Sequence, residues 1–188
     1  LTLTEPGAAF FLEAVTLEPP KTLTDYAALS AEYDTGKNTA EQPIVIQGED
    51  AAVKSTNSLI PKSDPTAAGL TPSSPYLTKL NYIGGNSWKN PLETLTWTFD
   101  VSAPGYYKIG FHYKQSYVIN GESRRILRID GKIPFKEASD VSFSYGTGWQ
   151  FKQLESGGEP CYVWLETGTH TLSMEVTLGA VSEYYRRM

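Results

Sequence analysis

The side chains of this sequence that could do chemistry are few, and flat aromatic rings far outnumber them. The 188 residues include 4 Trp, 12 Tyr and 7 Phe, but only 2 His, 2 Met and a single cysteine, Cys161. One cysteine excludes an internal disulfide framework and a cysteine-rich zinc site. The composition therefore argues against histidine- or cysteine-based catalysis and favours apolar contact surfaces.

Motifs of catalysis are missing from the sequence. It contains no G-x-S-x-G elbow, no G-x-x-x-x-G-K loop and no H-E-x-x-H pair. His112 and His170 lie within predicted strands, where a lone histidine usually has a structural role. A pair of carboxylates could act as a glycosidase, but among 21 acidic residues such pairs arise easily by chance. We therefore expect the chain not to be an enzyme.

The net charge and the hydropathy of the sequence limit the kinds of partner that the chain can bind. The net charge is −5 and the pI about 5.1, so the chain lacks the basic surface that nucleic acid requires. No apolar run approaches the roughly 20 residues of a membrane-spanning helix. We expect neither nucleic-acid binding nor membrane insertion. The chain begins at Leu1 without a signal peptide, which we interpret as a piece of a longer protein.

The pattern that must position these aromatic rings is that of β-strands. In residues 94–101, apolar residues alternate with Thr and Asp, which is typical of a half-buried strand. Asp130-Gly131 is a hairpin turn signal, and a polar stretch, 54–75, predicts a long loop. Short strands without intervening helices predict an all-β sandwich or jelly roll. The expected strands cover residues 44–47, 95–101, 107–113, 126–129, 133–135, 141–145, 161–165 and 172–176.

The two ends of the chain carry further elements. The pattern of residues 1–17 predicts two strands. A capping-box-like start at Thr22 predicts a helix of about three turns that ends near Gly36. We expect residues 1–42 to form N-terminal strands and a linker helix, residues 43–180 the sandwich, and residues 181–188 the start of a following helix.

Five stretches in this order resemble the galactose-binding-like β-sandwich of family 6 and family 35 carbohydrate-binding modules. The resemblance covers roughly residues 43–178 and implies a jelly-roll sandwich. It extends, more loosely, to modules embedded in bacterial extracellular solute-binding or polysaccharide-active proteins. The stretches are IVIQGEDA at 44–51, LTWTFDV at 95–101, APGYYKI at 103–109, LRIDGK at 127–132 and LETGTHTL at 165–172.

The sequence departs from the family at the closing strand. These modules usually end with one more strand after the stretch that matches 165–172, whereas here a helix is predicted. Residues 10–17 look like that strand, either as a remnant of a preceding module or as the strand that completes this sandwich. We favour completion, because an unpaired sandwich edge promotes aggregation.

The resemblance also implies a structural calcium ion. The family binds it with carboxylates of the first and closing strands, which Glu49 and Glu13 match here. Gln47 stands where the family has a second acid, and this loss would weaken the site. The alternative is that Glu49 and Asp50 are simply the polar end of a strand.

Sugar binding in such folds requires an aromatic face for the pyranose and polar groups that orient it. The family usually contacts its ligand through the loops at one end of the sandwich. We therefore expect the loops of Trp88 and Trp149 to converge, although any single ring could instead pack in the core, as Trp97 and Phe99 are expected to do. The candidate carbohydrate-binding residues are Tyr76, Tyr82, Asn86, Trp88, Tyr117, Asn120, Arg124 and Trp149, with Asn81 and Lys152 as polar companions.

A basic cluster, Arg124, Arg125 and Arg128, has two interpretations. The arginines could grip the carboxylate of an anionic sugar such as a uronate. The blander interpretation is a solvated strand whose charges protect a sheet edge.

These features lead to two hypotheses of function. The first is a non-catalytic carbohydrate-binding module of a larger extracellular or surface-attached bacterial protein, with glycan and the neighbouring domains as its partners. The second is a structural or protein-interaction sandwich of a multidomain extracellular protein that binds no sugar. Exposed aromatic rings clustered at one end would favour the first.

Overall fold

The computed structural model describes residues 22–33, 42–65, 69–74 and 76–179. Predictions for the strands within 1–17, for Glu13 and for the helix at 181–188 lie outside these residues.

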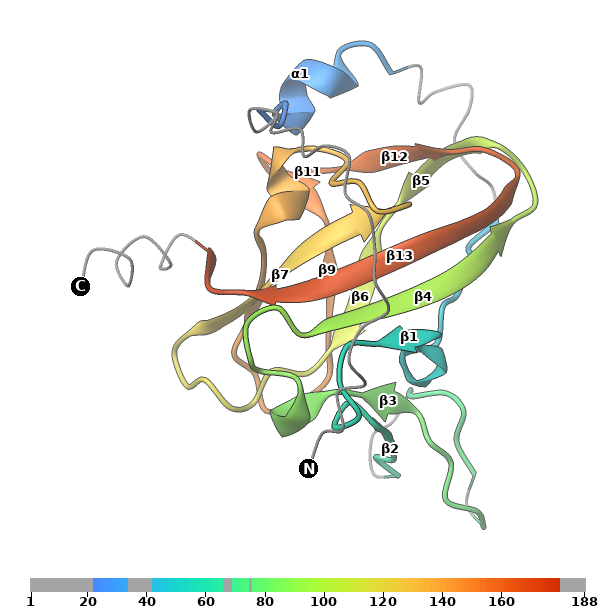
Figure 1. Cartoon of the computed structure of the whole chain (residues 1–188), viewed down its shortest axis with the longest axis vertical. Helices are drawn as coiled ribbons and strands as arrows, with labels where there is room; N and C mark the ends of the chain where they lie inside the picture. Colours follow the sequence, from blue (N-terminus) through green and yellow to red (C-terminus); the bar gives the residue numbers. More distant parts are fainter. Residues whose placement is uncertain (1–21, 34–41, 66–68, 75, 180–188) are drawn as a thin grey trace, which may run out of the picture.

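Two layers of antiparallel strands form the molecule (Figure 1). The first layer is a five-stranded sheet in the order β1 (Val53–Lys54), β4 (Thr94–Val101), β13 (Gly168–Thr177), β7 (Glu122–Ile129) and β8 (Val141–Ser144). The second layer consists of two strand pairs, β5 (Gly105–Lys108) with β12 (Tyr162–Leu165) and β6 (Gly110–Tyr113) with β9 (Gln150–Gln153). The all-β fold class is thereby confirmed.

Short elements complete the fold. They are α1 (Tyr26–Ser30), η1 (Gly48–Asp50), β2 (Pro61–Lys62), β3 (Tyr82–Ile83), η2 (Gly85–Ser87), η3 (Lys136–Ser139), β10 (Glu155–Ser156) and β11 (Glu159–Pro160). The hairpin of β2 and β3 lies at the end of the molecule opposite the helix α1 (Figure 1).

The core lies between the two layers and follows the period of two. Along β4, Leu95, Trp97 and Val101 are buried, while the threonines between them are half-buried or exposed. Leu127 of β7 is fully buried opposite Val163 and Leu165 of β12, whose inward positions also alternate. Burying a side chain of this size contributes about 2 kcal/mol. The hydrophobic alternation thus determines which face of each strand turns inward.

Several predicted elements differ from the structure. The strand expected at 107–113 is interrupted at Ile109, so that β5 and β6 pair with different strands. Residues 43–47, expected as a strand, pair with no described strand. Ile44 and Ile46 pack against the core, whereas Val45 is 74% exposed. The alternation of these residues therefore reflects packing without strand pairing. The polar stretch 54–75 contains β2 and the end of β1. The helix α1 is only five residues long rather than about three turns, and its N-cap residue Asp25 makes no side-chain capping bond.

The helix α1 shares the core of the sandwich. Tyr26 is buried, its ring lies 5.0 Å from that of Phe135, and its hydroxyl accepts a hydrogen bond from the Tyr162 N–H at 2.9 Å. The Tyr26 N–H donates to the carboxylate of Glu137, with the nearer oxygen at 2.9 Å. The N-terminal segment is therefore fastened to the sandwich through Tyr26.

The turn predicted at Asp130-Gly131 is present, but residues 133–135 form no strand, and the turn closes in an isolated bridge. Both turn residues have positive φ, 49° and 74°, which a tight two-residue turn requires, and Ile129 pairs with Lys132. His170 Nδ1 lies 2.7 Å from the Asp130 carboxylate and His170 Nε2 lies 2.9 Å from the Glu166 carbonyl. The hydrogen bond to Asp130 raises the pKa of His170, so this histidine has a structural contact at the turn. Within the described ranges, no helix is long and apolar enough to cross a membrane.

Candidate functional site

Three loops meet at the end of the sandwich that carries the β2–β3 hairpin. Trp149 immediately precedes β9, and its ring centroid lies 5.7 Å from that of Tyr82 on β3 and 5.5 Å from that of His112 on β6. Tyr117, from the loop of residues 115–121, contributes the fourth ring, with its hydroxyl beside Gly85. We call Tyr82, His112, Tyr117 and Trp149 the loop-end cluster.

Asp64 provides the polar contact of the Trp149 ring. The indole N–H of Trp149 donates to Asp64 Oδ2 at 3.1 Å, and Lys114 Nζ forms an ion pair with the same oxygen at 3.8 Å. Asp64 itself is held by the buried Asn81, whose side-chain oxygen accepts its N–H and whose amide donates to its carbonyl. The orientation of Trp149 is therefore fixed from the hairpin, 85 residues earlier in the chain.

Gln115 holds the loop of residues 115–121 in one conformation. It is buried, its Oε1 accepts the N–H groups of Tyr117 and Val118 at 2.9 Å, and its Nε2 donates to the carbonyls of Val118 and Gly121. All four bonds stay within the loop, so the exposed Tyr117 is presented by a satisfied backbone.

Two consecutive glycines lie between Tyr117 and Trp88, Gly85 beside the first and Gly84 beside the second. Gly84 and Gly85 have φ of 100° and 68°, which favours glycine at both positions. A Cβ on Gly85 would lie 3.6 Å from the Tyr117 hydroxyl and 3.9 Å from Lys62 Nζ. Lys62 Nζ donates to the Gly84 carbonyl at 2.9 Å. Burial raises the pKa of Tyr82, and nearby Tyr117 and Asp64 raise it further, so its hydroxyl stays protonated.

The loop-end cluster combines flat rings with one positively and one negatively charged hydrogen-bonding group. Trp149 and Tyr117 offer ring faces, while the ammonium of Lys62 and the carboxylate of Asp64 lie beside them. A ring face suits the C–H side of a pyranose, and polar groups placed around it suit its hydroxyls. The arrangement has the chemistry of a shallow sugar-binding surface.

Trp88, predicted to share this site, is partly buried and packs against the core of the sandwich. Its ring packs 6.5 Å from that of Trp97 in the core and under Gly84, where a Cβ would come within 3.1 Å of it. The guanidinium of Arg125 stacks on its other side at 4.4 Å, and its indole N–H donates to the Glu93 carbonyl. The loops of Trp88 and Trp149 do meet, but through Tyr82.

Arg125 and Glu93 are both buried beside Trp88. Burial lowers the pKa of Arg125 to about 10, with nearby Glu93 opposing the shift, so the guanidinium stays charged at neutral pH. Burial alone would raise the pKa of Glu93, but hydrogen bonds from Asn90 and Lys89 and the charge of Arg125 lower it overall. The interpretation of Arg125 as a solvated or sugar-gripping arginine is thus wrong, since its side chain points inward.

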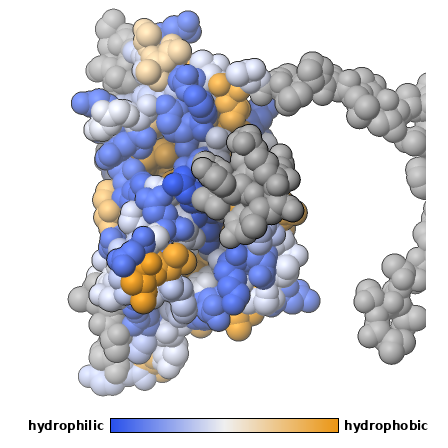
Figure 2. Space-filling view, turned by 90° about the vertical axis from the view of Figure 1, so that its left-hand side faces the viewer, coloured by the Kyte–Doolittle hydropathy of each residue, from blue (hydrophilic) through white to orange (hydrophobic). Residues whose placement is uncertain are grey.

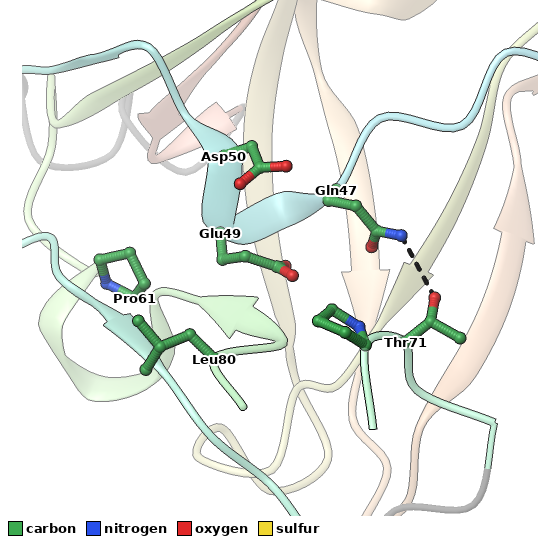
Figure 3. A pocket seen from close by; sticks show the side chains of 7 residues that line it. Gln47, Glu49, Asp50, Pro61, Thr71 and Leu80 are labelled. Atoms are coloured by element: carbon green, nitrogen blue, oxygen red, sulfur yellow. Dashed lines mark hydrogen bonds between the residues drawn. The ribbon is translucent and has the colours of Figure 1, made fainter. Parts of the chain in front are cut away.

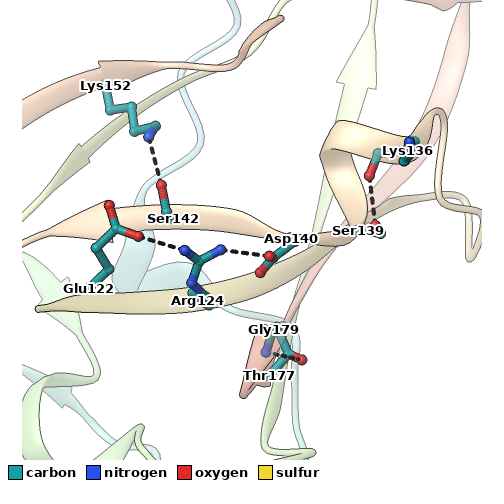
Figure 4. Close-up of polar contacts among 9 residues, drawn as sticks. All are labelled: Glu122, Arg124, Lys136, Ser139, Asp140, Ser142, Lys152, Thr177 and Gly179. Carbon is teal, nitrogen blue, oxygen red and sulfur yellow. Dashed lines mark hydrogen bonds and ion pairs between the residues drawn. The ribbon is translucent and has the colours of Figure 1, made fainter. Parts of the chain in front are cut away.

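Arg124 and Arg128 point to the opposite side of β7, the outer face of the five-stranded sheet. Arg124 pairs with Asp140 at 2.6 Å and with Glu122 at 2.8 Å (Figure 4). Arg128 pairs with Glu175 on β13 at 3.0 Å. The structure therefore does not bring Arg124 to the loop-end cluster. In the same view, Lys152 of β9 donates to Ser142 of β8, a contact between the two layers.

Three other candidates lie at the surface. Tyr76 is 92% exposed, and its backbone N–H donates a hydrogen bond to Ser74 Oγ. Asn86 follows Gly85, and its side chain accepts a hydrogen bond from Lys89. Asn120 is exposed, with φ of 56°, in the loop that carries Tyr117. The chain thus places Asn86 and Asn120 on loops of the cluster.

A separate open groove of about 480 Å³ lies beside η1 (Figure 3). Glu49, Asp50, Gln47, Thr71 and Leu80 line it, and Gln47 donates to Thr71 at 3.2 Å. Glu49 Oε2 is buried without a hydrogen-bond partner among the described residues. Burial raises the pKa of Glu49, partly offset by a backbone hydrogen bond, and neighbouring Asp50 raises it further.

This groove permits a test of the predicted calcium site. Buried, unpartnered carboxylate oxygen suits a hard cation such as Ca²⁺, so Glu49 fits the role. Among the described residues, however, no three acidic, histidine or cysteine side chains gather around one point. Glu13, the other predicted ligand, lies outside the described residues.

Comparison with known proteins identifies the architecture. No protein-family model matches the sequence, and no curated protein sequence matches it significantly. Among solved structures, a GH26-CBM35 β-(1,4)-mannanase of Podospora anserina superimposes with a TM-score of 0.50 at 16% identity, over 74% of this chain. The fold is a β-sandwich like that of family 35 carbohydrate-binding modules. This family 35-like sandwich spans about a quarter of the mannanase, 26%.

A second structure is a single module. A family 35 carbohydrate-binding module of Clostridium thermocellum has 16% identity and a TM-score of 0.48, and the match covers 72% of this chain and 87% of that one. At these identities the similarity concerns the fold, and the ligand must be argued from the side chains of this chain.

Sequence reasoning missed the polar members of the site. His112 was assigned a structural role, yet it is exposed beside Trp149. Asp64, Lys62 and Lys114 gave no signal, because their contacts join segments far apart in the chain. Gln115 could have been noticed as a polar residue that directly precedes a predicted loop rich in apolar residues.

Proposed function

We propose that this chain is a non-catalytic carbohydrate-binding module of a larger extracellular bacterial protein, and that it binds glycan at the loop-end cluster. The observation that carries the proposal is the convergence of Tyr82, Tyr117 and Trp149 from three loops at one end of the sandwich, with Asp64 and Lys62 beside them. The non-catalytic part of the proposal is supported by the likeness of the fold to family 35 carbohydrate-binding modules.

The binding mechanism is stacking with directional polar contacts. The ring of Trp149 is held by its bond to Asp64, so little conformational entropy is lost when a sugar packs on it. Tyr117 and Lys62 would donate hydrogen bonds to hydroxyls, and Asp64 would accept them. Because the surface is shallow, we expect weak binding to single sugars.

The name of one structural neighbour suggests the first ligand to test. That protein is a β-(1,4)-mannanase, so β-1,4-mannan heads the panel, and a polysaccharide-active domain is a fitting neighbour for this module in its own parent protein. The panel continues with xylan, mixed-linkage β-glucan, dextran and polygalacturonate, and each polymer is cast into native gels to measure the retardation of the protein.

A matched pair of variants tests the site. Trp149→Ala should abolish retardation by the binding polymer, whereas Trp164→Ala should leave it unchanged, because Trp164 is a partly exposed tryptophan on β12 outside the loop-end cluster. Equal migration of wild type and Trp149→Ala, or a wild type that no polymer retards, would contradict the proposal.

One observation favours the alternative, a protein-interaction sandwich. A second set of rings lies on the outer face of the β5–β12 pair. There the ring centroid of Tyr106 lies 4.8 Å from that of Tyr33 and 5.0 Å from that of Trp164. Exposed aromatic rings are thus not confined to one end. On the face seen in Figure 2, which is the left-hand side of Figure 1, apolar patches are separated by hydrophilic surface.

We further propose that Glu49, with the side-chain oxygen of Gln47, contributes to a structural calcium site. The ion would compensate the unpartnered Glu49 oxygen. Added Ca²⁺ should raise the melting temperature of the wild type and EDTA should reverse this, while Glu49→Gln should respond to neither. A wild type indifferent to both additions would end this proposal without affecting the sugar site.

A further inference from the structure

The outer face of the β6–β9 pair continues from the loop-end cluster. Phe111 and Tyr113 of β6 point to the core, where their rings pack 5.3 and 4.9 Å from that of Phe143. Side chains alternate along a strand, so His112 points outward, as does Phe151, its partner on β9. The outward side chains thus include two rings directly opposite each other.

Phe151 lies on this face as a flat platform. Phe151 is 72% exposed, although phenylalanine is usually buried in proteins. Its ring edge covers Gly110, where a Cβ would come within 2.7 Å of Phe151 Cζ. The glycine therefore lets the ring lie against the backbone of β6, with its other side turned to solvent.

The platform is continuous with the cluster. His112 connects the two, since it pairs with Phe151 and its ring is 5.5 Å from that of Trp149. The Cα atoms of Trp149 and Phe151, two residues apart, are separated by at most about 7 Å. Gln153, the partner of Gly110, stands on the far side of the ring and offers an amide to hydroxyl groups.

We propose that the ring of Phe151, flanked by His112 and Gln153, is a second sugar subsite, so that the module binds a linear polysaccharide along β6 and β9 rather than an isolated sugar. The inference rests on the proposed function, because the chain would enter this subsite from Trp149. Rings in series, separated by hydrogen-bonding side chains, match a polymer whose successive pyranoses each present a C–H face.

Ligand length provides the test. For each polymer of the panel that retards the wild type, its hexasaccharide and its disaccharide are titrated by calorimetry. Phe151→Ala should weaken hexasaccharide binding roughly three- to tenfold, the value of one stacking contact, and leave disaccharide binding within about twofold. Phe151→Tyr should restore the affinity, and Gly110→Ala, which displaces the ring without removing it, should weaken the hexasaccharide alone.

Each outcome separates the two proposals. If Trp149→Ala loses binding while Phe151→Ala keeps full hexasaccharide affinity, the second subsite is wrong and the loop-end site stands. Equal losses for both ligand lengths in Phe151→Ala would also overturn the subsite. If no polymer of the panel retards the wild type, both proposals fall. Thermal melting of every variant verifies that the exposed substitutions leave the fold intact.

Discussion

The surroundings of Trp88 and of Trp149 are alike in sequence and burial but differ in the side chains that contact each ring. Both tryptophans follow short polar turns that contain glycine. Trp149 bonds to a carboxylate at the surface and borders two other rings of the loop-end cluster. Trp88, which is also partly buried, packs against Trp97 and the guanidinium of Arg125. We therefore propose Trp149 and not Trp88 as the stacking residue, because the faces of Trp88 are occupied by a core ring and a cation.

The difference originates in one strand. β7 presents Arg125 inward, where Glu93 compensates its charge and the Trp88 carbonyl accepts its N–H at 3.0 Å. No buried charge of this kind lies under Trp149 among its described contacts. The first region should therefore respond to substitution mainly through stability, and the second mainly through binding.

Trp88→Ala should have the largest effect on stability. It removes a ring that packs on the core and leaves Arg125 without its stacking partner, so we expect a loss of about 3 kcal/mol in the free energy of unfolding. Urea denaturation measures this loss. A loss below about 1 kcal/mol would show that Trp88 is not the packing residue that its contacts describe.

Glu93→Gln should follow, at about 2 kcal/mol, because it leaves the buried Arg125 uncompensated. The folded-state pKa of Glu93 is lowered, so its ionised form stabilises the fold above the unfolded pKa near 4.5, and this contribution is lost as the pH falls through the lower folded value. Urea titrations at several pH values should therefore show a smaller acid-induced loss in Glu93→Gln than in the wild type.

Gln115→Ala should affect both properties. It removes four hydrogen bonds within the 115–121 loop, and we expect about 1–2 kcal/mol less stability. Because Tyr117 then loses its fixed position, polymer retardation should weaken as well. Unchanged retardation at reduced stability would remove Tyr117 from the site while leaving Trp149 in it.

Trp149→Ala should have the smallest effect on stability, less than about 1 kcal/mol, although it abolishes binding. The ring is only partly buried and belongs to the surface cluster. If denaturation shows a loss as large as that of Trp88→Ala, the contrast between the two regions does not hold.

The sequence predicted the sandwich because its decisive signals are local. Alternation along β4 and the turn at Asp130-Gly131 need only neighbouring residues, and both are present as expected. The five-part family resemblance likewise predicted a fold that the structural comparison supports.

The site was less predictable because its contacts are long-range. The contacts of each tryptophan come from distant segments: Arg125 contacts Trp88 from 37 residues away, and Asp64 bonds to Trp149 from 85 residues away. Phe151 could not be recognised as a platform either, since its exposure depends on Gly110 across the strand pair. The register of strand pairing determines which of these residues meet. The amino-acid composition of a loop does not encode that register.

The buried cysteine has a practical consequence. Cys161 is fully enclosed in the core, and burial, with smaller contributions from Glu137 and Glu155, raises the pKa of its thiol to about 12. Only roughly one thiol in ten thousand is then ionised at pH 8, and the thiolate is the form that alkylating reagents attack. A cysteine introduced at the exposed Tyr76 could therefore be labelled selectively with a fluorophore while the natural thiol stays unreacted, which allows a single-colour optical readout of ligand capture.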